Sequence, residues 1–185
     1  IENTLEALAS SEHDVETVVL TGRKYAGDRI RKYQVVDGLD YTTPNHAVDP
    51  GLLIERMKDA ARNALGGDPD LWHFHNHSLG KNPSLTKATA KLAEEGEFIL
   101  LHPHDFAEDG RPDNFKALEK VYDHAYPACA RIRYAALNNR DRLFLENLFG
   151  GTSTEVHLLA NPIRENESST TGETVKTSIP ENLIL

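Results

Sequence analysis

Short apolar runs alternate with helical patterns along most of the chain. The two strongest runs, residues 70–77 and 98–105, both end in alternating histidines. A period of two places His73, His75 and His77 on one face if that strand continues. A helical pattern separates the runs and predicts strand, helix, strand. A parallel crossover of this kind brings both carboxyl ends to one edge of a sheet, where open α/β sheets bind ligands.

Several helices have recognisable beginnings. Asp49-Pro50 and Asn82-Pro83 each combine a capping side chain with proline at the first helical position, and Pro112 begins another helix. In the first of these helices the lone methionine, Met57, falls on the apolar face. Asn138-Asn139 predicts a last helix, and its residues expected to point inward are Leu143, Phe144 and Leu148.

The remaining apolar runs predict strands at residues 15–20, 33–40, 130–137 and 156–159. Strands that alternate with helices predict an α/β fold, a doubly wound and mostly parallel sheet with helices on both faces. Residues 1–163 are expected to form one domain. From residue 164 the chain is polar and aperiodic, so residues 164–185 are interpreted as a linker and the start of a carboxyl-terminal domain that this sequence lacks.

The charge excludes one class of partner. The 185 residues carry a net charge of -9, which argues against binding to nucleic acid. A basic stretch, residues 23–32, is either a solvated loop or a phosphate contact. The single cysteine, Cys129, lies among small apolar residues and is expected to be a buried structural thiol. No run is long enough to span a bilayer and no signal peptide is recognisable, so a cytoplasmic location is expected.

The two His-x-His clusters suggest a metal, because imidazole is the commonest transition-metal ligand. Carboxylates are scarce, however, and the later strands offer only His157 as a further ligand. We therefore expect no metal, and a His-x-His metal-dependent hydrolase remains an alternative. For His73 and His102 the plainer interpretation is a pair of strand histidines with satisfied hydrogen bonds.

His104 and Asp105 lie where a strand gives way to a loop rich in Asp, Gly and Arg. A histidine in this position can donate to a ligand hydroxyl while a carboxylate fixes its orientation. Adjacent strand residues point apart, so the alternative role for Asp105 is to cap the loop.

Four segments together resemble a known family. They are residues 70–76, His104-Asp105, residues 134–148 with Asn138-Asn139-Arg140-Asp141 at their turn, and residues 156–163. The sequence resembles the amino-terminal, Rossmann-like domain of retaining glycosyltransferases of the GT-B fold, the class that includes sucrose-phosphate synthase and mannosyltransferases.

The resemblance implies that this half binds a sugar or sugar-phosphate acceptor and that the absent domain binds a nucleotide-sugar donor. It implies no metal or other cofactor. It places His104 near the transferred sugar, with Asp105 beside it as a catalytic candidate. It assigns substrate binding to His75, Asn76, Asn138, Asn139 and Arg140. The isolated chain is expected to be inactive, and a stand-alone carbohydrate-binding domain is the non-enzymatic alternative.

Overall fold

The computed structural model describes residues 1–41 and 47–161. The expected linker, residues 164–185, lies outside the described residues. The helices are α1 (Glu2–Ala9), α2 (Pro50–Leu65), α3 (Pro83–Glu94), α4 (Pro112–Leu118), the 3-10 helix η1 (Glu119–His124) and α5 (Asn139–Leu148). The strands are β1 (Val19–Thr21), β2 (Tyr33–Val35), β3 (Trp72–His75), β4 (Ile99–His102), β5 (Ile132–Ala136) and β6 (Glu155–Leu158).

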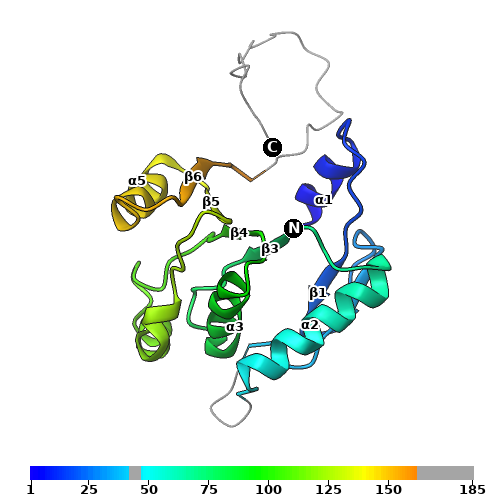
Figure 1. Cartoon of the computed structure of the whole chain (residues 1–185), viewed down its shortest axis with the longest axis horizontal. Coiled ribbons are helices and arrows are strands. Elements are labelled where there is room, and N and C mark those ends of the chain that lie inside the picture. Colours follow the sequence, from blue (N-terminus) through cyan, green and yellow to red (C-terminus); the bar gives the residue numbers. More distant parts are fainter. Residues whose placement is uncertain (42–46, 162–185) are drawn as a thin grey trace.

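Four strands form a parallel sheet in the order β3-β4-β5-β6, and β1 pairs with β2, also in parallel. Strands β3, β4 and β5 are each followed by a helix before the chain enters the next strand in the same direction (Figure 1). This is the Rossmann-like α/β arrangement that the alternating pattern predicts. All four strands therefore have their carboxyl ends at one edge of the sheet.

One face of the larger sheet is apolar and holds the core. Paired residues of parallel strands share a face, and the register aligns Trp72 with Ile99 and then with Ile132. Apolar residues of α2, α3 and α5 join the same core, among them Leu53, Leu92 and Leu145, which are fully buried. The helices following β2, β3 and β5 therefore cover this face.

The opposite face carries His73, His75 and His102, since His75 is aligned with His102. Helix α1 lies on this side, because its first turn and His104 line the same cavity. The sheet is thus flanked by helices, with its apolar and polar faces clearly separated.

The helix beginnings follow the capping signals. Asp49 accepts a hydrogen bond from the Leu52 N–H at the start of α2, and Asn82 accepts one from the Leu85 N–H at the start of α3. Helix α2 ends at Gly66, whose φ of +78° is one that glycine adopts without strain. Met57 is buried, as predicted, and Cys129 is a free, partly buried thiol packed against the core.

Two expectations about local packing were wrong. Strand β3 ends at His75, and Asn76 has a φ of +55°, so the chain turns before His77. His77 is consequently buried on the core side, where its Nε2–H donates to the Ala125 carbonyl at 2.9 Å. It does not share a face with His73 and His75.

The inward face of α5 was also predicted wrongly. The residues expected to point inward are exposed, by 52% at Leu143, 39% at Phe144 and 44% at Leu148. Asp141 and Leu145 are buried instead. Helix α5 therefore faces the core with Asp141 and Leu145, and the side that carries the three predicted residues is exposed.

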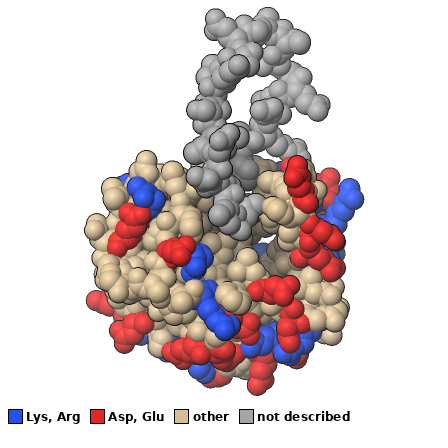
Figure 2. All heavy atoms as spheres, turned by 45° about the horizontal axis from the view of Figure 1, so that its top comes forward, with Lys and Arg blue, Asp and Glu red and all other residues tan. Residues whose placement is uncertain are grey.

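Three basic side chains of residues 23–32 are paired with acidic side chains. Arg23 pairs with Asp40, Lys32 pairs with Glu16, and Arg29 contacts both Glu2 (2.5 Å) and Glu6 (2.9 Å). Acidic and basic side chains lie next to one another over much of the face shown in Figure 2. In the part of the chain that the structure describes, no helix is long and apolar enough to cross a membrane.

Candidate functional site at the carboxyl edge of the sheet

Asn76 joins the ends of β3 and β4. Its side-chain Oδ1 accepts hydrogen bonds from the backbone N–H groups of His104 (2.6 Å) and Asp105 (3.2 Å). Its own N–H donates to the His102 carbonyl at 3.2 Å. The turn at Asn76 therefore fixes the segment that carries His104 and Asp105, at the edge predicted from the two apolar runs.

The histidine rings pack against one another across the strands. His75 Nδ1 lies 2.8 Å from His104 Nε2, and His73 Nε2 lies 3.3 Å from His102 Nδ1. Burial is the main reason that the pKa values of His73 and His102 are lowered to about 4, and neighbouring histidine rings contribute in the same direction. Burial also lowers the pKa of His75, to about 2, and lowers that of His104. The four rings are neutral at pH 7, so each has one donor and one acceptor nitrogen.

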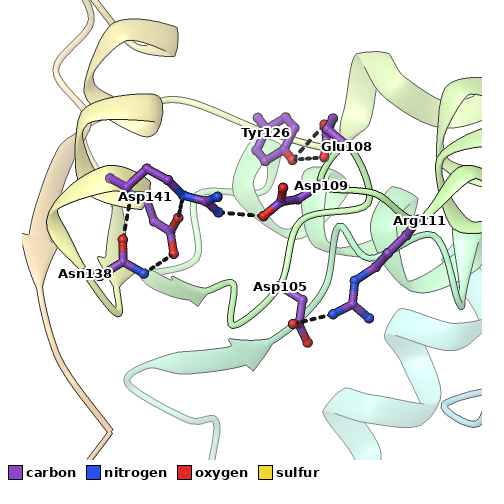
Figure 3. A network of polar contacts seen from close by, with 8 residues as sticks. Asp105, Glu108, Asp109, Arg111, Tyr126, Asn138 and Asp141 are labelled. Carbon is purple, nitrogen blue, oxygen red and sulfur yellow. Dashed lines mark hydrogen bonds and ion pairs between the residues drawn. The ribbon is translucent and has the colours of Figure 1, made fainter.

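The partner of the His104 ring is His75 and not Asp105. The Asp105 carboxylate accepts from Arg111 at 2.5 Å, which closes the loop after β4 (Figure 3). Asp105 therefore does not orient the His104 ring, and its ion pair with Arg111 joins two residues of the loop after β4. Glu108 of the same loop accepts from the Tyr126 hydroxyl at 2.9 Å.

The start of α5 is tied to this loop. Asn138 caps the helix by accepting from the Asp141 N–H at 3.0 Å and donates to the buried Asp141 carboxylate at 2.7 Å. Arg140 bridges Asp141 (3.0 Å) and Asp109 (2.6 Å), so it links the helix to the loop after β4. The Asn138–Asn139–Arg140 turn therefore lies at the same edge as Asn76 and His104.

A cavity of about 680 Å³ opens beside His104. Its other walls come from the amino-terminal end of α1, from β1 and from the segment between β1 and β2. Polar groups facing it include Tyr25, Arg29 and Asn161. This volume is within the range of small-molecule sites. His104 is the predicted site residue that lines this cavity.

The sequence does not predict the other residues that line this cavity with His104. Arg29 belongs to the basic stretch, for which a phosphate contact was one of two interpretations, and this is the signal that pointed toward it. The sequence pattern identifies Asp109 and Arg111 only as members of a loop rich in Asp, Gly and Arg. Their pairing with Arg140 and Asp105 depends on how two separate loops meet at the sheet edge, which no local pattern encodes.

The chain forms a Rossmann-like α/β domain. Its polar site lies at the edge of the sheet where the parallel strands end. One curated protein is similar in sequence: mannosylglucosyl-3-phosphoglycerate synthase of Petrotoga mobilis (strain DSM 10674 / SJ95), with 25% identity over 154 residues. The match covers 76% of this chain and 30% of that protein, so the chain spans less than a third of the relative's length. No protein-family model and no solved structure matches the chain.

Proposed function

We propose that this chain is the acceptor-side domain of a retaining glycosyltransferase, which transfers a sugar from a nucleotide-sugar donor to a sugar or sugar-phosphate acceptor. The similarity to a synthase of mannosylglucosyl-3-phosphoglycerate supports this class of reaction. The observation that carries the proposal is the position of His104, at a strand end and on the wall of a polar cavity.

His104 is suited to hold a hydroxyl of the sugar. Its Nε2 contacts His75, which leaves Nδ1 for a ligand. Its lowered pKa keeps the ring neutral at pH 7, so it forms a hydrogen bond without bringing a buried charge. The hydrogen bond from the His104 N–H to the Asn76 side chain fixes the backbone of His104. Preorganised groups of this kind contribute most to transition-state stabilisation.

Arg29 offers the proposed acceptor a cationic group on the wall of the same cavity. Its pairing with Glu2 and Glu6 holds the guanidinium in place but also offsets much of its charge. A phosphorylated acceptor would therefore compete with these carboxylates for Arg29, whereas a neutral sugar would be held by the hydroxyl and amide groups. The donor is assigned to a second domain, so transfer is expected only from a protein that has both.

The test uses the full-length protein that carries this chain. It is incubated with nucleotide sugars and with acceptors that include sugar phosphates and glycosylated 3-phosphoglycerate, and products are identified by mass spectrometry. Because a hydrogen bond to a polar ligand group contributes about 0.5–1.5 kcal/mol, and more with charge, His104→Ala should lower kcat about tenfold or more. His124→Ala, in the η1 helix that packs on α3, is the matched control.

Two results would reject the proposal. An unchanged rate for His104→Ala together with a large fall in its melting temperature would make His104 a packing residue. Hydrolysis of substrates without any nucleotide sugar, dependent on an added metal, would favour the metal-dependent hydrolase instead.

A further inference from the structure

The polar face of the sheet carries a compact group of imidazoles that the proposed transfer does not explain. We call His73, His75 and His102 the histidine triad. One nitrogen of each lies within 4.8 Å of the corresponding nitrogens of the other two. We propose that the histidine triad binds a divalent transition metal ion, with Zn²⁺ the best fit.

The closest pair in the triad already has the spacing that two ligands of one ion require. His73 Nε2 and His102 Nδ1 are 3.3 Å apart. Two nitrogens at Zn–N distances of about 2.0–2.1 Å in a tetrahedron are separated by about 3.3–3.4 Å. The third ring, His75, needs to approach by about 1.5 Å at most, which a side-chain rotation supplies.

The backbone supports this geometry. His75 and His102 are directly aligned across the parallel pair β3 and β4, and His73 lies two residues earlier on the same face. From the sequence we expect no metal, because the later strands offer only His157 as a further ligand. The structure instead supplies the third ligand from the neighbouring strand, at a residue interpreted as an ordinary strand histidine.

The three ligands are all imidazoles, which suit borderline transition-metal cations such as Zn²⁺. The ligand set contains nitrogen and no carboxylate, a composition that favours zinc, copper or nickel over magnesium or calcium. The Nε2 atom of His102 is buried and has no hydrogen-bond partner among the described residues.

His104 has a different role in this arrangement. Its Nε2 is 2.8 Å from His75 Nδ1, too close for both atoms to be ligands of one tetrahedral ion. A ligand histidine ordinarily donates its other N–H to a partner that fixes its tautomer, and His104 provides that partner for His75. The ion would cross-link β3 to β4 just below the edge that carries His104.

The site is independent of the proposed transfer reaction, so it is tested by binding alone. The 185-residue chain, purified without a histidine tag and stripped with a chelator, is titrated with Zn²⁺ by calorimetry and with Co²⁺ by visible absorption. We expect one equivalent of metal, a dissociation constant in the micromolar range or tighter, and Co²⁺ bands of tetrahedral intensity. Zn²⁺ should also raise the melting temperature by several degrees, because it binds only the folded chain.

Variants identify the ligands. His73→Ala and His102→Ala should each weaken Zn²⁺ binding at least 100-fold, and His104→Ala, which removes an outer partner, about 10- to 100-fold. His157→Ala is the matched control, since this histidine is exposed on the same sheet face and contacts Glu155. It should bind Zn²⁺ as the unmodified chain does.

The proposal is overturned if the stripped, folded chain binds neither Zn²⁺ nor Co²⁺ in the micromolar range. It is equally overturned if His73→Ala and His102→Ala bind as tightly as the control. If an alanine variant loses its circular dichroism, His102→Gln replaces it, and the Zn²⁺-dependent rise in melting temperature of the unmodified chain still decides the outcome. Failure of sugar transfer in the full-length protein would leave these results unchanged.

Discussion

Asn76 holds His104 in place through a 2.6 Å hydrogen bond from the His104 N–H to the Asn76 side chain. Asn76 does so from a left-handed backbone conformation, with a φ of +55°. Asparagine and glycine adopt this conformation at lower cost than other residues. One residue thus ends β3, turns the chain and fixes the end of β4.

Substitutions at Asn76 should separate its two contributions. Asn76→Ala loses two hydrogen bonds and forces alanine into the left-handed region, which together should lower the free energy of unfolding by about 2–4 kcal/mol. Asn76→Gly keeps the backbone conformation and should lose about 1–2 kcal/mol less than the alanine variant. Asn76→Asp retains the acceptor and should remain close to the unmodified chain. Urea denaturation measures all three.

The comparison between alanine and glycine is the decisive one. Equal losses for the two variants would mean that the backbone of residue 76 relaxes at no cost, and the turn would not be what positions His104. An unchanged stability for Asn76→Ala would show in addition that the side-chain clamp contributes nothing.

His77 should make the stability of the chain depend on pH. Burial lowers its pKa in the folded state to about 4, whereas the ordinary value is 6.5. The unfolded chain therefore binds more protons between these values, so stability is complete above about pH 6.5 and falls as the pH drops toward 4. One proton corresponds to a slope of about 1.4 kcal/mol per pH unit, or roughly 3 kcal/mol over the window.

His77→Gln tests this assignment. Glutamine can keep the donor to the Ala125 carbonyl but does not titrate in this range. Free energies of unfolding are measured by urea between pH 4 and 7.5 with a chelator present, and the variant should show a slope smaller by up to one proton. His157→Gln, at an exposed position, is the control. An identical slope in His77→Gln and the unmodified chain would show that His77 is not the titrating group.

Much of the fold is readable from the sequence because its signals are local. Asp49, Asn82 and Asn138 begin helices through their own side chains, and the apolar runs that become β3 and β4 need only a period of two. The sequence also predicts that His75, Asn76 and His104 lie at one edge of the sheet, because parallel strands have their carboxyl ends at the same edge. Their use by a substrate remains a prediction.

Other features depend on contacts that a local pattern does not contain. The position of His77 depends on the positive φ of one residue, Asn76. A strand pattern with a period of two gives no sign that the strand ends before His77. The partner of His104 is set by the register of β3 against β4. The cavity requires residues from α1 and from the segment around Arg29 to meet His104, across more than 70 positions of sequence.

The cap of α5 should contribute measurably to stability. Asn138 satisfies the Asp141 N–H and also donates to the buried Asp141 carboxylate. Loss of an asparagine cap costs about 0.5–2 kcal/mol, and a buried carboxylate left with one donor fewer adds to this, so Asn138→Ala should lose about 2 kcal/mol. Asn139→Ala, one residue further at an exposed position, should change stability by less than about 0.5 kcal/mol. Thermal or urea unfolding of the pair compares them, and equal losses would contradict the capping role.

Arg140 should act differently from Asn138. Its side chain is 68% exposed although it contacts both Asp109 and Asp141. Exposed ion pairs contribute about 0–1 kcal/mol, so Arg140→Ala should leave stability within that range. If the proposed function holds, the same variant loosens the loop after β4 in the full-length protein, and KM for the acceptor should rise. A loss of stability as large as that of Asn138→Ala would show that the pair behaves as a buried one.

The orientation of α5 provides the sharpest test of the fold itself. The apolar pattern predicted Leu143 and Leu148 as inward residues, but Leu145 is the leucine that is fully buried, in the same core as Tyr134 and Phe149. Truncation of a fully buried leucine costs about 2–5 kcal/mol, whereas a half-exposed one has few contacts to lose. Leu145→Ala should therefore be strongly destabilising, and Leu143→Ala should change the free energy of unfolding by less than about 1 kcal/mol. Urea denaturation of the two single variants, which differ only in their position on one helix, decides between the two orientations. A reversed order, with Leu143→Ala the more damaging, would mean that α5 packs with the face that the sequence pattern favours.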